Sequence, residues 1–163
     1  MESEKDQYLK NWDKEFHTTI KVLKAYPQDK QDMKPAERSK TAKELAWVFG
    51  NEEKAFFAGI MAGKLDMKNL SPPPDTITEA ISLYERYHKE NVERFKKLDA
   101  STLKKTMKFF VAPKTMGDVP IMELLWFMLM DQIHHRGQFS VYLRIAGAKV
   151  PSIYGPTADE PWN

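Results

Sequence analysis

The amino-acid sequence predicts an all-α protein built as a four-helix bundle, and three observations lead to this prediction. Four long segments place apolar residues every three to four positions, which is the period of an α-helix. Polar or proline-containing stretches separate these segments, and no strand-length run alternates apolar and polar residues. One segment, residues 116–147, is much more apolar than the other three. It is therefore expected to be buried on most sides of the bundle.

The first two helices are delimited by recognisable end signals. The first is expected over residues 4–24, and Pro27 closes it. The second is expected from about Thr41 to about Met61, because Thr41 and Glu44 have the spacing of a capping box. The apolar stripes of the two helices contain Leu9, Trp12, Phe16, Ile20 and Leu23 in the first, and Leu45, Val48, Phe49, Ala55, Phe56 and Gly59 in the second.

A proline-rich linker over residues 63–74 precedes the third helix, which begins at a second capping box, Thr76 to Glu79. The apolar stripe of this helix includes His88, which is interpreted as a core histidine hydrogen-bonded to a neighbour. Residues 101–114 have only a weak helical pattern and a lysine-rich face. They are expected to form a connection with one or two helical turns.

The last segment begins with the turn residues Gly117, Asp118 and Pro120 and is expected to end as a helix at Gly147. Polar residues gather in its otherwise apolar middle. Four of its residues share one helical face, because they recur about once per turn; they are Asp131, His135, Gln138 and Tyr142. We therefore expect this polar strip to face something specific.

Composition limits the classes of function. The chain has 163 residues and is expected to form a single domain over residues 1–163. Its net charge of +2 is nearly balanced, so neither a nucleic-acid partner nor a membrane is expected. It has no cysteine, which excludes thiolate ligands and a cysteine nucleophile. The charged start lacks the apolar core of a signal peptide, and a cytoplasmic location is expected.

The run His134-His135-Arg136-Gly137-Gln138 resembles the last-helix signature of the DinB-like family, which is related to bacterial low-molecular-weight thiol transferases. Residues 44–47 and 154–160 also resemble segments of that family. The resemblance implies a bundle with up-down-down-up connectivity, commonly a homodimer. It also implies a divalent metal held by one histidine of the second helix and two of the last helix, four residues apart.

This sequence departs from the implied ligand pattern at two positions. Val48 occupies the place of the second-helix histidine and Asp131 that of the first histidine in the pair, whereas His135 is retained. The mycothiol-dependent maleylpyruvate isomerase branch resembles this chain in having an acid at the Asp131 position. Glu52, one turn beyond Val48, is the leading replacement ligand. Such a set suits zinc, nickel, iron or manganese, and His88 is an alternative contributor.

Two hypotheses about function follow. In the first, Glu52, Asp131 and His135 hold a divalent metal in a transferase or hydrolase that acts on a small molecule with an external thiol. Gln138 and Tyr142 then bind the substrate, and no catalytic residue is assigned. In the second, the protein is a metal-free dimeric binding or structural member, because Val48 cannot coordinate a metal.

Two neighbouring residues of the same motif carry structural expectations. Arg136 is expected to pair with an acid near a helix end or with a dimer partner. Gly137 in mid-helix predicts the close approach of a neighbouring helix. In the metal-free hypothesis, Asp131 and His135 form a buried ion pair, with Gln138 and Glu52 around it.

Overall fold

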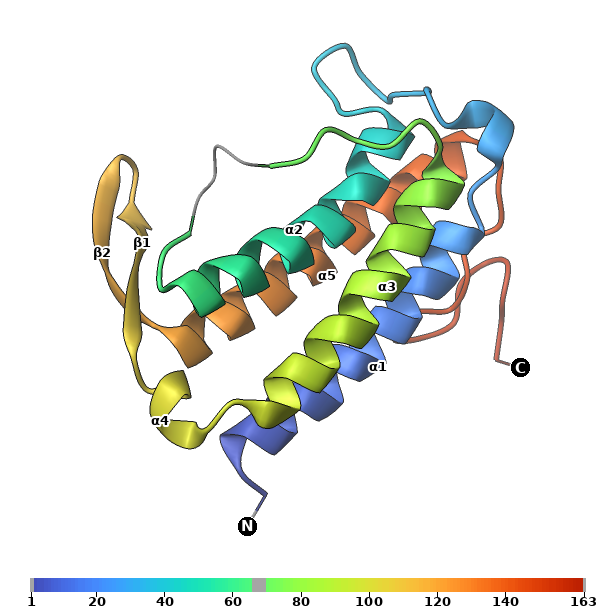
Figure 1. Cartoon of the computed structure of the whole chain (residues 1–163). Helices are drawn as coiled ribbons and strands as arrows, with labels where there is room; N and C mark the ends of the chain where they lie inside the picture. The colour runs from blue at the N-terminus through green and yellow to red at the C-terminus, as the bar shows by residue number, and fades with distance from the viewer. Residues whose placement is uncertain (1, 66–69, 163) are drawn as a thin grey trace.

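A computed structural model describes residues 2–65 and 70–162 and shows four long helices lying side by side (Figure 1). α2 packs against α3 and α5, and α1 packs against the same two helices. The predicted four-helix bundle is therefore confirmed. The four helices are α1 (Glu4–Lys24), α2 (Ala42–Ala62), α3 (Ile77–Lys97) and α5 (Ile121–Ile145).

The helices follow an up-down-down-up path. In Figure 1, α1 and α5 run from the lower end of the bundle to the upper end, whereas α2 and α3 run downward. Two consecutive parallel helices need a long return connection, and the predicted linker over residues 63–74 provides it. Its residues 66–69 lie outside the described part of the chain. A short 3-10 helix, η1 (Gln28–Lys30), interrupts the connection between α1 and α2.

The predicted helix starts are confirmed by their capping contacts. The Thr41 side chain accepts a hydrogen bond from the Glu44 backbone N–H, and the Glu44 carboxylate accepts one from the Thr41 N–H, which completes the capping box. Thr76 caps α3 by accepting from the Glu79 N–H. At the other end of the chain, Gly147 follows α5 with a φ of 72°, a left-handed conformation that glycine adopts without strain.

The connection after α3 differs from the prediction. A single helical turn, α4 (Ala100–Leu103), is followed by an antiparallel hairpin of β1 (Thr106–Ala112) and β2 (Thr115–Pro120). Gly117 and Asp118 therefore lie in a strand, and α5 begins only after Pro120. The strands escaped prediction because both project from the bundle with mostly exposed side chains, so no buried face imposes an alternating pattern.

Two hydrophobic clusters fill the bundle, one toward each end, and α5 contributes to both. The cluster at the end of the bundle away from the hairpin contains Phe16, Leu45, Phe49, Tyr84, Phe139 and Leu143. The cluster nearer the hairpin contains Tyr8, Trp12, Phe57, Phe95, Leu125 and Leu129. No helix in the described part of the chain is long and apolar enough to cross a membrane. The cytoplasmic location stays a prediction.

Buried polar side chains lie between the two clusters on each long helix. We call this set the polar layer: Glu15, Glu53, His88, Asn91, Gln132 and Arg136. Because these groups are largely removed from water, each needs a partner inside the protein. Contacts within the polar layer link α1 to α5 through Glu15 and Arg136, and α2 to α3 through Glu53 and His88.

Candidate metal centre

Beside the polar layer, three potential metal ligands meet between α2 and α5. Glu52 comes from α2, and Asp131 and His135 come from α5; we call them the metal cluster. One ligand atom from each lies within 4.8 Å of the other two. The His135 Nε2 is 3.5 Å from a Glu52 oxygen and 3.5 Å from an Asp131 oxygen. No other group of this kind occurs among residues 2–65 and 70–162.

The helical geometry explains this convergence. Asp131 and His135 are four residues apart, so α5 projects them from the same face, one turn from each other. α2 packs along α5, which brings Glu52 to the same height. The three sequence-predicted ligands are therefore neighbours in space.

The spacing of the metal cluster fits a single ion. Two ligands about 2.1 Å from a tetrahedral ion lie roughly 3.4 Å apart, and the two distances to His135 Nε2 are 3.5 Å. In addition, the Glu52 Oε2 atom is buried and has no hydrogen-bond partner. An unpaired buried oxygen is costly unless a ligand satisfies it. The donors present therefore suit a divalent cation.

Glu52 has the most perturbed ionisation of the cluster. The pKa of its carboxyl group is raised to about 9, mainly by burial and further by the negative charge of Asp131, a hydrogen bond with Asp131 and the charge of Glu53. At neutral pH and without a metal, Glu52 therefore holds a proton. Binding of a cation at Glu52 must displace this proton, so metal affinity and pH are linked.

Gln138 orients the imidazole ring of His135. The His135 Nδ1 is 3.1 Å from the Gln138 Oε1, and the Gln138 Nε2 is 2.9 Å from the His134 Nε2. In this arrangement the His135 Nδ1–H donates to the amide oxygen, and the amide N–H donates to His134. The His135 Nε2 then faces the carboxylates of Glu52 and Asp131, each 3.5 Å away. A ligand histidine commonly has its other ring nitrogen fixed in this way.

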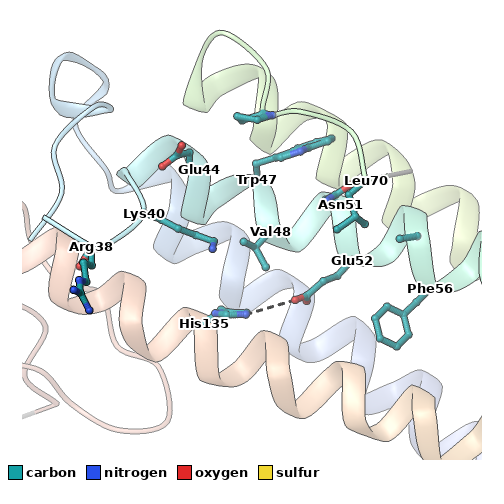
Figure 2. Close-up of a pocket in the computed structure, with 13 residues that line it drawn as sticks. Arg38, Lys40, Glu44, Trp47, Val48, Asn51, Glu52, Phe56, Leu70 and His135 are labelled. Carbon is teal, nitrogen blue, oxygen red and sulfur yellow. Dashed lines mark ion pairs between the residues drawn. The ribbon is translucent and has the colours of Figure 1, made fainter. Parts of the chain in front are cut away.

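An open cavity of about 510 Å³ lies next to the metal cluster, and both Glu52 and His135 line it. Figure 2 shows their side chains meeting on one side of this cavity, with Val48 beside them. Val48 offers no donor atom and instead packs partly against the hydrophobic core. The place of the family histidine is therefore an apolar part of the cavity wall.

A second cavity of about 490 Å³ is lined by His135, Gln138 and Tyr142. The Tyr142 hydroxyl donates a hydrogen bond to the Lys40 carbonyl oxygen over 2.8 Å. Tyr142 thus holds the loop before α2 against α5. Substrate binding by Gln138 and Tyr142 stays a prediction.

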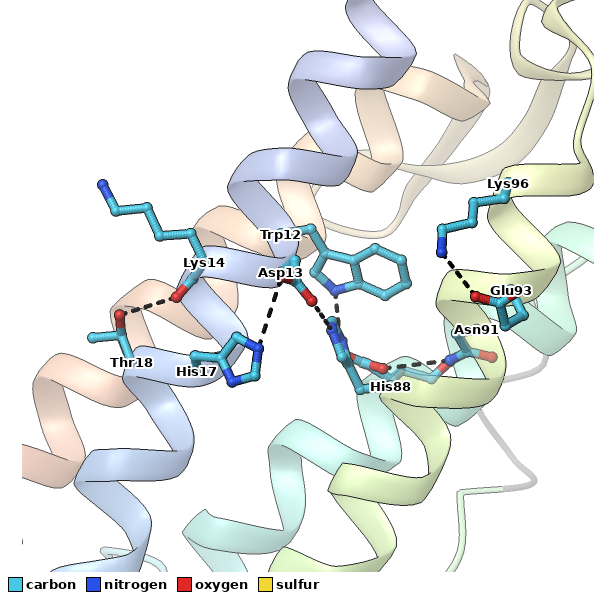
Figure 3. Close-up of polar contacts among 10 residues, drawn as sticks. Trp12, Asp13, Lys14, His17, Thr18, His88, Asn91, Glu93 and Lys96 are labelled. Carbon is cyan, nitrogen blue, oxygen red and sulfur yellow. Dashed lines mark hydrogen bonds and ion pairs between the residues drawn. The ribbon is translucent and has the colours of Figure 1, made fainter.

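His88 belongs to a different constellation (Figure 3). Its Nδ1 is 3.0 Å from a Glu53 oxygen, and its Nε2 is 3.5 Å from an Asp13 oxygen. The same Glu53 oxygen accepts from the Trp12 Nε1–H over 3.1 Å. The interpretation of His88 as a hydrogen-bonded core histidine is confirmed, and it does not join the metal cluster. The sequence analysis missed Glu53, although its spacing of four residues from Phe49 and three from Phe56 places it on the same buried face of α2.

Arg136 pairs with an acid as expected, but not near a helix end, and Gly137 meets no neighbouring helix of the described chain. Arg136 is 1% exposed and forms a 2.7 Å ion pair with Glu15, which lies within α1 rather than at a helix end. Its other nitrogen donates to the Tyr154 hydroxyl, which in turn donates to Glu15. A Cβ at Gly137 would meet nothing within 4 Å, so no helix in the described part of the chain approaches it. The glycine faces outward from α5.

Fold and site together define a class: a helical bundle whose carboxylate–histidine cluster faces an open cavity. A model of the DinB family matches residues 1–162, and the chain therefore belongs to the DinB family. This confirms the resemblance read from the HHRGQ run.

Relatives and solved structures agree with this assignment. The chain is 28% identical over 161 residues to the uncharacterized protein YrdA of Bacillus subtilis strain 168, covering 95% of this chain and 90% of YrdA. It is similar in fold to a DinB-like protein from Bacillus cereus ATCC 10987, with a TM-score of 0.75 and 23% identity over 90% of this chain and 95% of the other.

A third similarity is to YfiT from Bacillus subtilis, which is described as a probable metal-dependent hydrolase with an unusual four-helix bundle topology. The TM-score is 0.70 at 12% identity, and 89% of each chain is covered. At this identity the similarity shows the fold alone.

Proposed function

We propose that this protein binds one divalent metal ion through Glu52, Asp131 and His135 and is a metal-dependent hydrolase of a small molecule. One observation carries the proposal: three donors converge within 4.8 Å, one with an unpaired buried oxygen, beside a cavity of about 510 Å³. The description of YfiT as a probable metal-dependent hydrolase supports the same class of activity.

The donor set favours zinc, manganese or iron, since two carboxylates and one imidazole are common ligands of these ions, and nickel is a further candidate. An ion with three protein ligands and an open position supplies Lewis acidity for activating water or polarising a carbonyl group. The protein's own contribution is to hold the ligands. Gln138 fixes the His135 ring, and Glu52 gives up its proton to become an anionic donor.

The finer alternative is transfer of an external low-molecular-weight thiol instead of water. The chain contains no cysteine, so the thiol would enter through the cavity as a second substrate. Both reactions use the same metal cluster. They differ in whether an added thiol appears in the product, which mass spectrometry detects directly.

Metal binding is tested with purified protein that carries no histidine tag. Calorimetric titration with zinc, manganese, iron(II) or nickel is expected to give one site per chain. Metal-loaded protein should hydrolyse 4-nitrophenyl acetate faster than His135→Ala protein treated identically. Absence of saturable binding of any of the four ions overturns the proposal and favours the metal-free hypothesis. Binding without ester hydrolysis, but with thioether formation from an added thiol, selects the transferase.

We further propose that the protein is a homodimer that packs through the outer face of α5. Four apolar side chains on this face are 45–59% exposed: Phe127, Met130, Val141 and Ile145. Gly137 lies among them and leaves open space in which a second helix could approach closely. Sedimentation of the wild-type protein should give a dimer mass, and Val141→Glu should give a monomer. A wild-type monomer at all concentrations contradicts this proposal.

A further inference from the structure

Two positively charged residues line the cavity but belong to no ion pair. Arg38 and Lys40 come from the loop that precedes α2, and both border the two cavities together with His135. Within residues 2–65 and 70–162, neither side chain has a hydrogen-bond or ion-pair partner. Figure 2 shows the Lys40 ammonium group turned toward Val48 and the Arg38 guanidinium group lying over α5.

The acidic residue on this side of the cavity, Glu44, already accepts a hydrogen bond within α2's capping box. Glu44 lines the cavity as well, but its carboxylate accepts a 2.7 Å hydrogen bond from the Thr41 backbone N–H in the capping box. The remaining acidic group of the cavity wall, Glu52, belongs to the metal cluster. The charge of Lys40 contributes to lowering the pKa of Glu44, but neither exposed cation forms an ion pair in the described part of the chain, so both can contact a ligand in the cavity.

Apolar side chains form one wall of the same cavity. Trp47, Val48, Phe56 and Leu70 provide it, and the Trp47 indole is fixed by a 2.9 Å hydrogen bond from its Nε1–H to the Ser71 carbonyl oxygen. A cavity that places cations beside His135 of the metal cluster, together with an apolar wall, matches an amphipathic organic anion.

We propose that Arg38 and Lys40 select a substrate that carries a carboxylate group on an apolar body. The guanidinium and ammonium groups hold the carboxylate, and the apolar body lies against Trp47 and Val48. The bond to be cleaved then reaches the metal cluster. This inference rests on the proposed function, because it assigns the substrate class of the same site.

The test uses two ligands of the same shape, naphthalene-1-acetate and the neutral naphthalene-1-acetamide. Affinities are measured by NMR titration of the full-length protein, both as purified and after chelator treatment. Wild-type protein should bind the acid at least about fivefold more tightly than the amide, as expected for charge-assisted hydrogen bonds at a solvent-accessible site. Resonances of the Trp47 indole should shift with both ligands.

Three variants locate the cause of this preference. Arg38→Gln with Lys40→Gln should abolish the preference for the acid while leaving the affinity for the amide unchanged. The charge-matched control, Arg86→Gln with Lys89→Gln on α3, should keep the preference. Arg38→Lys with Lys40→Arg should also keep most of it, because the charges remain. Circular dichroism verifies that each variant is folded.

Equal affinities for the two ligands in wild-type protein overturn the inference, as does a preference that survives in the Arg38→Gln, Lys40→Gln protein. The outcome is separable from that of the proposed function. Acid binding that depends on Arg38 and Lys40 in chelator-treated protein supports the anion site even if no metal binds. Tight metal binding with no preference for the acid retains the metal site and removes this substrate class.

Discussion

Glu52 and Glu53 are adjacent in α2, yet they have opposite surroundings. Glu53 is fully buried in the polar layer and accepts hydrogen bonds from Trp12 and His88, with the Asn91 amide 3.5 Å from its other oxygen. Glu52 faces the cavity with one buried oxygen unpaired. Burial is the main cause that raises the pKa of both carboxyl groups. A shifted pKa therefore does not distinguish a structural acid from a ligand, whereas these two carboxylates differ in their hydrogen-bond partners and in their exposure to the cavity.

The largest effect is expected from removing the satisfied carboxylate. Glu53→Ala strands the Trp12 N–H and the His88 ring in the core, so the free energy of unfolding should fall by about 3–5 kcal/mol. Urea unfolding in the presence of a chelator measures this loss. Glu52→Gln, the matched control one position away, should not lower the free energy of unfolding at pH 7, because the neutral amide replaces a carboxyl group that is protonated in the folded protein. If both variants lost the same free energy of unfolding, Glu53 would not be the structural carboxylate of the pair.

A second effect concerns pH in chelator-treated protein. The unfolded-state pKa of a glutamate is about 4.3, whereas that of folded Glu52 is about 9. Between these values the folded protein binds one proton more than the unfolded chain, so the contribution of Glu52 to stability falls as pH rises. Glu52→Gln removes this dependence. Its stability relative to wild type should therefore grow by on the order of 1 kcal/mol per pH unit between about pH 5 and pH 9.

Unfolding curves of wild type and Glu52→Gln at several pH values check this slope. Glu37→Gln, in the exposed loop before α2, is the control and should follow the wild type at every pH. If the difference in free energy of unfolding between Glu52→Gln and wild type did not change with pH, the Glu52 carboxyl group of the folded wild-type protein would be ionised at neutral pH.

The third prediction separates the metal ligand from a structural role. His135→Ala should lower zinc affinity by about 100-fold or more, because it removes the only nitrogen donor of the metal cluster. Its stability without metal should change little. Asp131 is 38% exposed in its side chain, so loss of its partner does not strand a buried charge, contrary to the buried ion pair of the metal-free hypothesis.

Zinc titration by calorimetry and urea unfolding in chelator give the two readouts. His17→Ala, on the exposed face of α1, removes an imidazole far from the cavity and should alter neither. A strongly destabilised His135→Ala protein with unchanged zinc affinity would reverse the assignment.

The smallest effect is expected from adding a ligand beside Glu52. Val48 lines the cavity next to Glu52 and His135 (Figure 2), so Val48→His places a further nitrogen donor near them. Zinc affinity should rise by about tenfold, since one more neutral ligand fills an open position. Val48→Ala, which enlarges the cavity without a donor, should leave the affinity unchanged. No gain in a folded Val48→His protein would show that position 48 points away from the ion.

Local signals made the helices predictable, whereas tertiary contacts decided much of the rest. Thr41 and Thr76 mark the starts of α2 and α3 in the sequence, because each forms its capping hydrogen bond with a residue only three positions later. The spacing of Asp131 and His135 likewise places two ligands on one face from sequence alone. Glu52 was selected from its position relative to the family histidine, and its carboxylate lies near Asp131 and His135, whereas its role as a ligand stays a prediction.

Other features had no local signal. The hairpin of residues 106–120 leaves most side chains exposed, so its alternation carries little hydrophobic contrast. The partner of Arg136 is 121 residues away in the sequence, and only the packing of α1 on α5 reveals it. The direction of Gly137, toward the outside of α5 rather than a neighbouring helix, also depends on tertiary structure.

The contact of Tyr154 with Arg136 and Glu15 has a consequence for the order of folding. Tyr154 and Glu15 are 139 residues apart, and Arg136 joins them. During synthesis α1 is made long before its buried acid can meet either partner. Until then, docking α1 in its final position buries the Glu15 carboxylate without a partner, which is costly. Forming a contact between residues so far apart in the sequence costs chain entropy, and proteins with many such contacts fold more slowly. We therefore expect the bundle to fold only after synthesis has passed Tyr154 and this residue has left the ribosome. Folding is then one cooperative step rather than helix by helix.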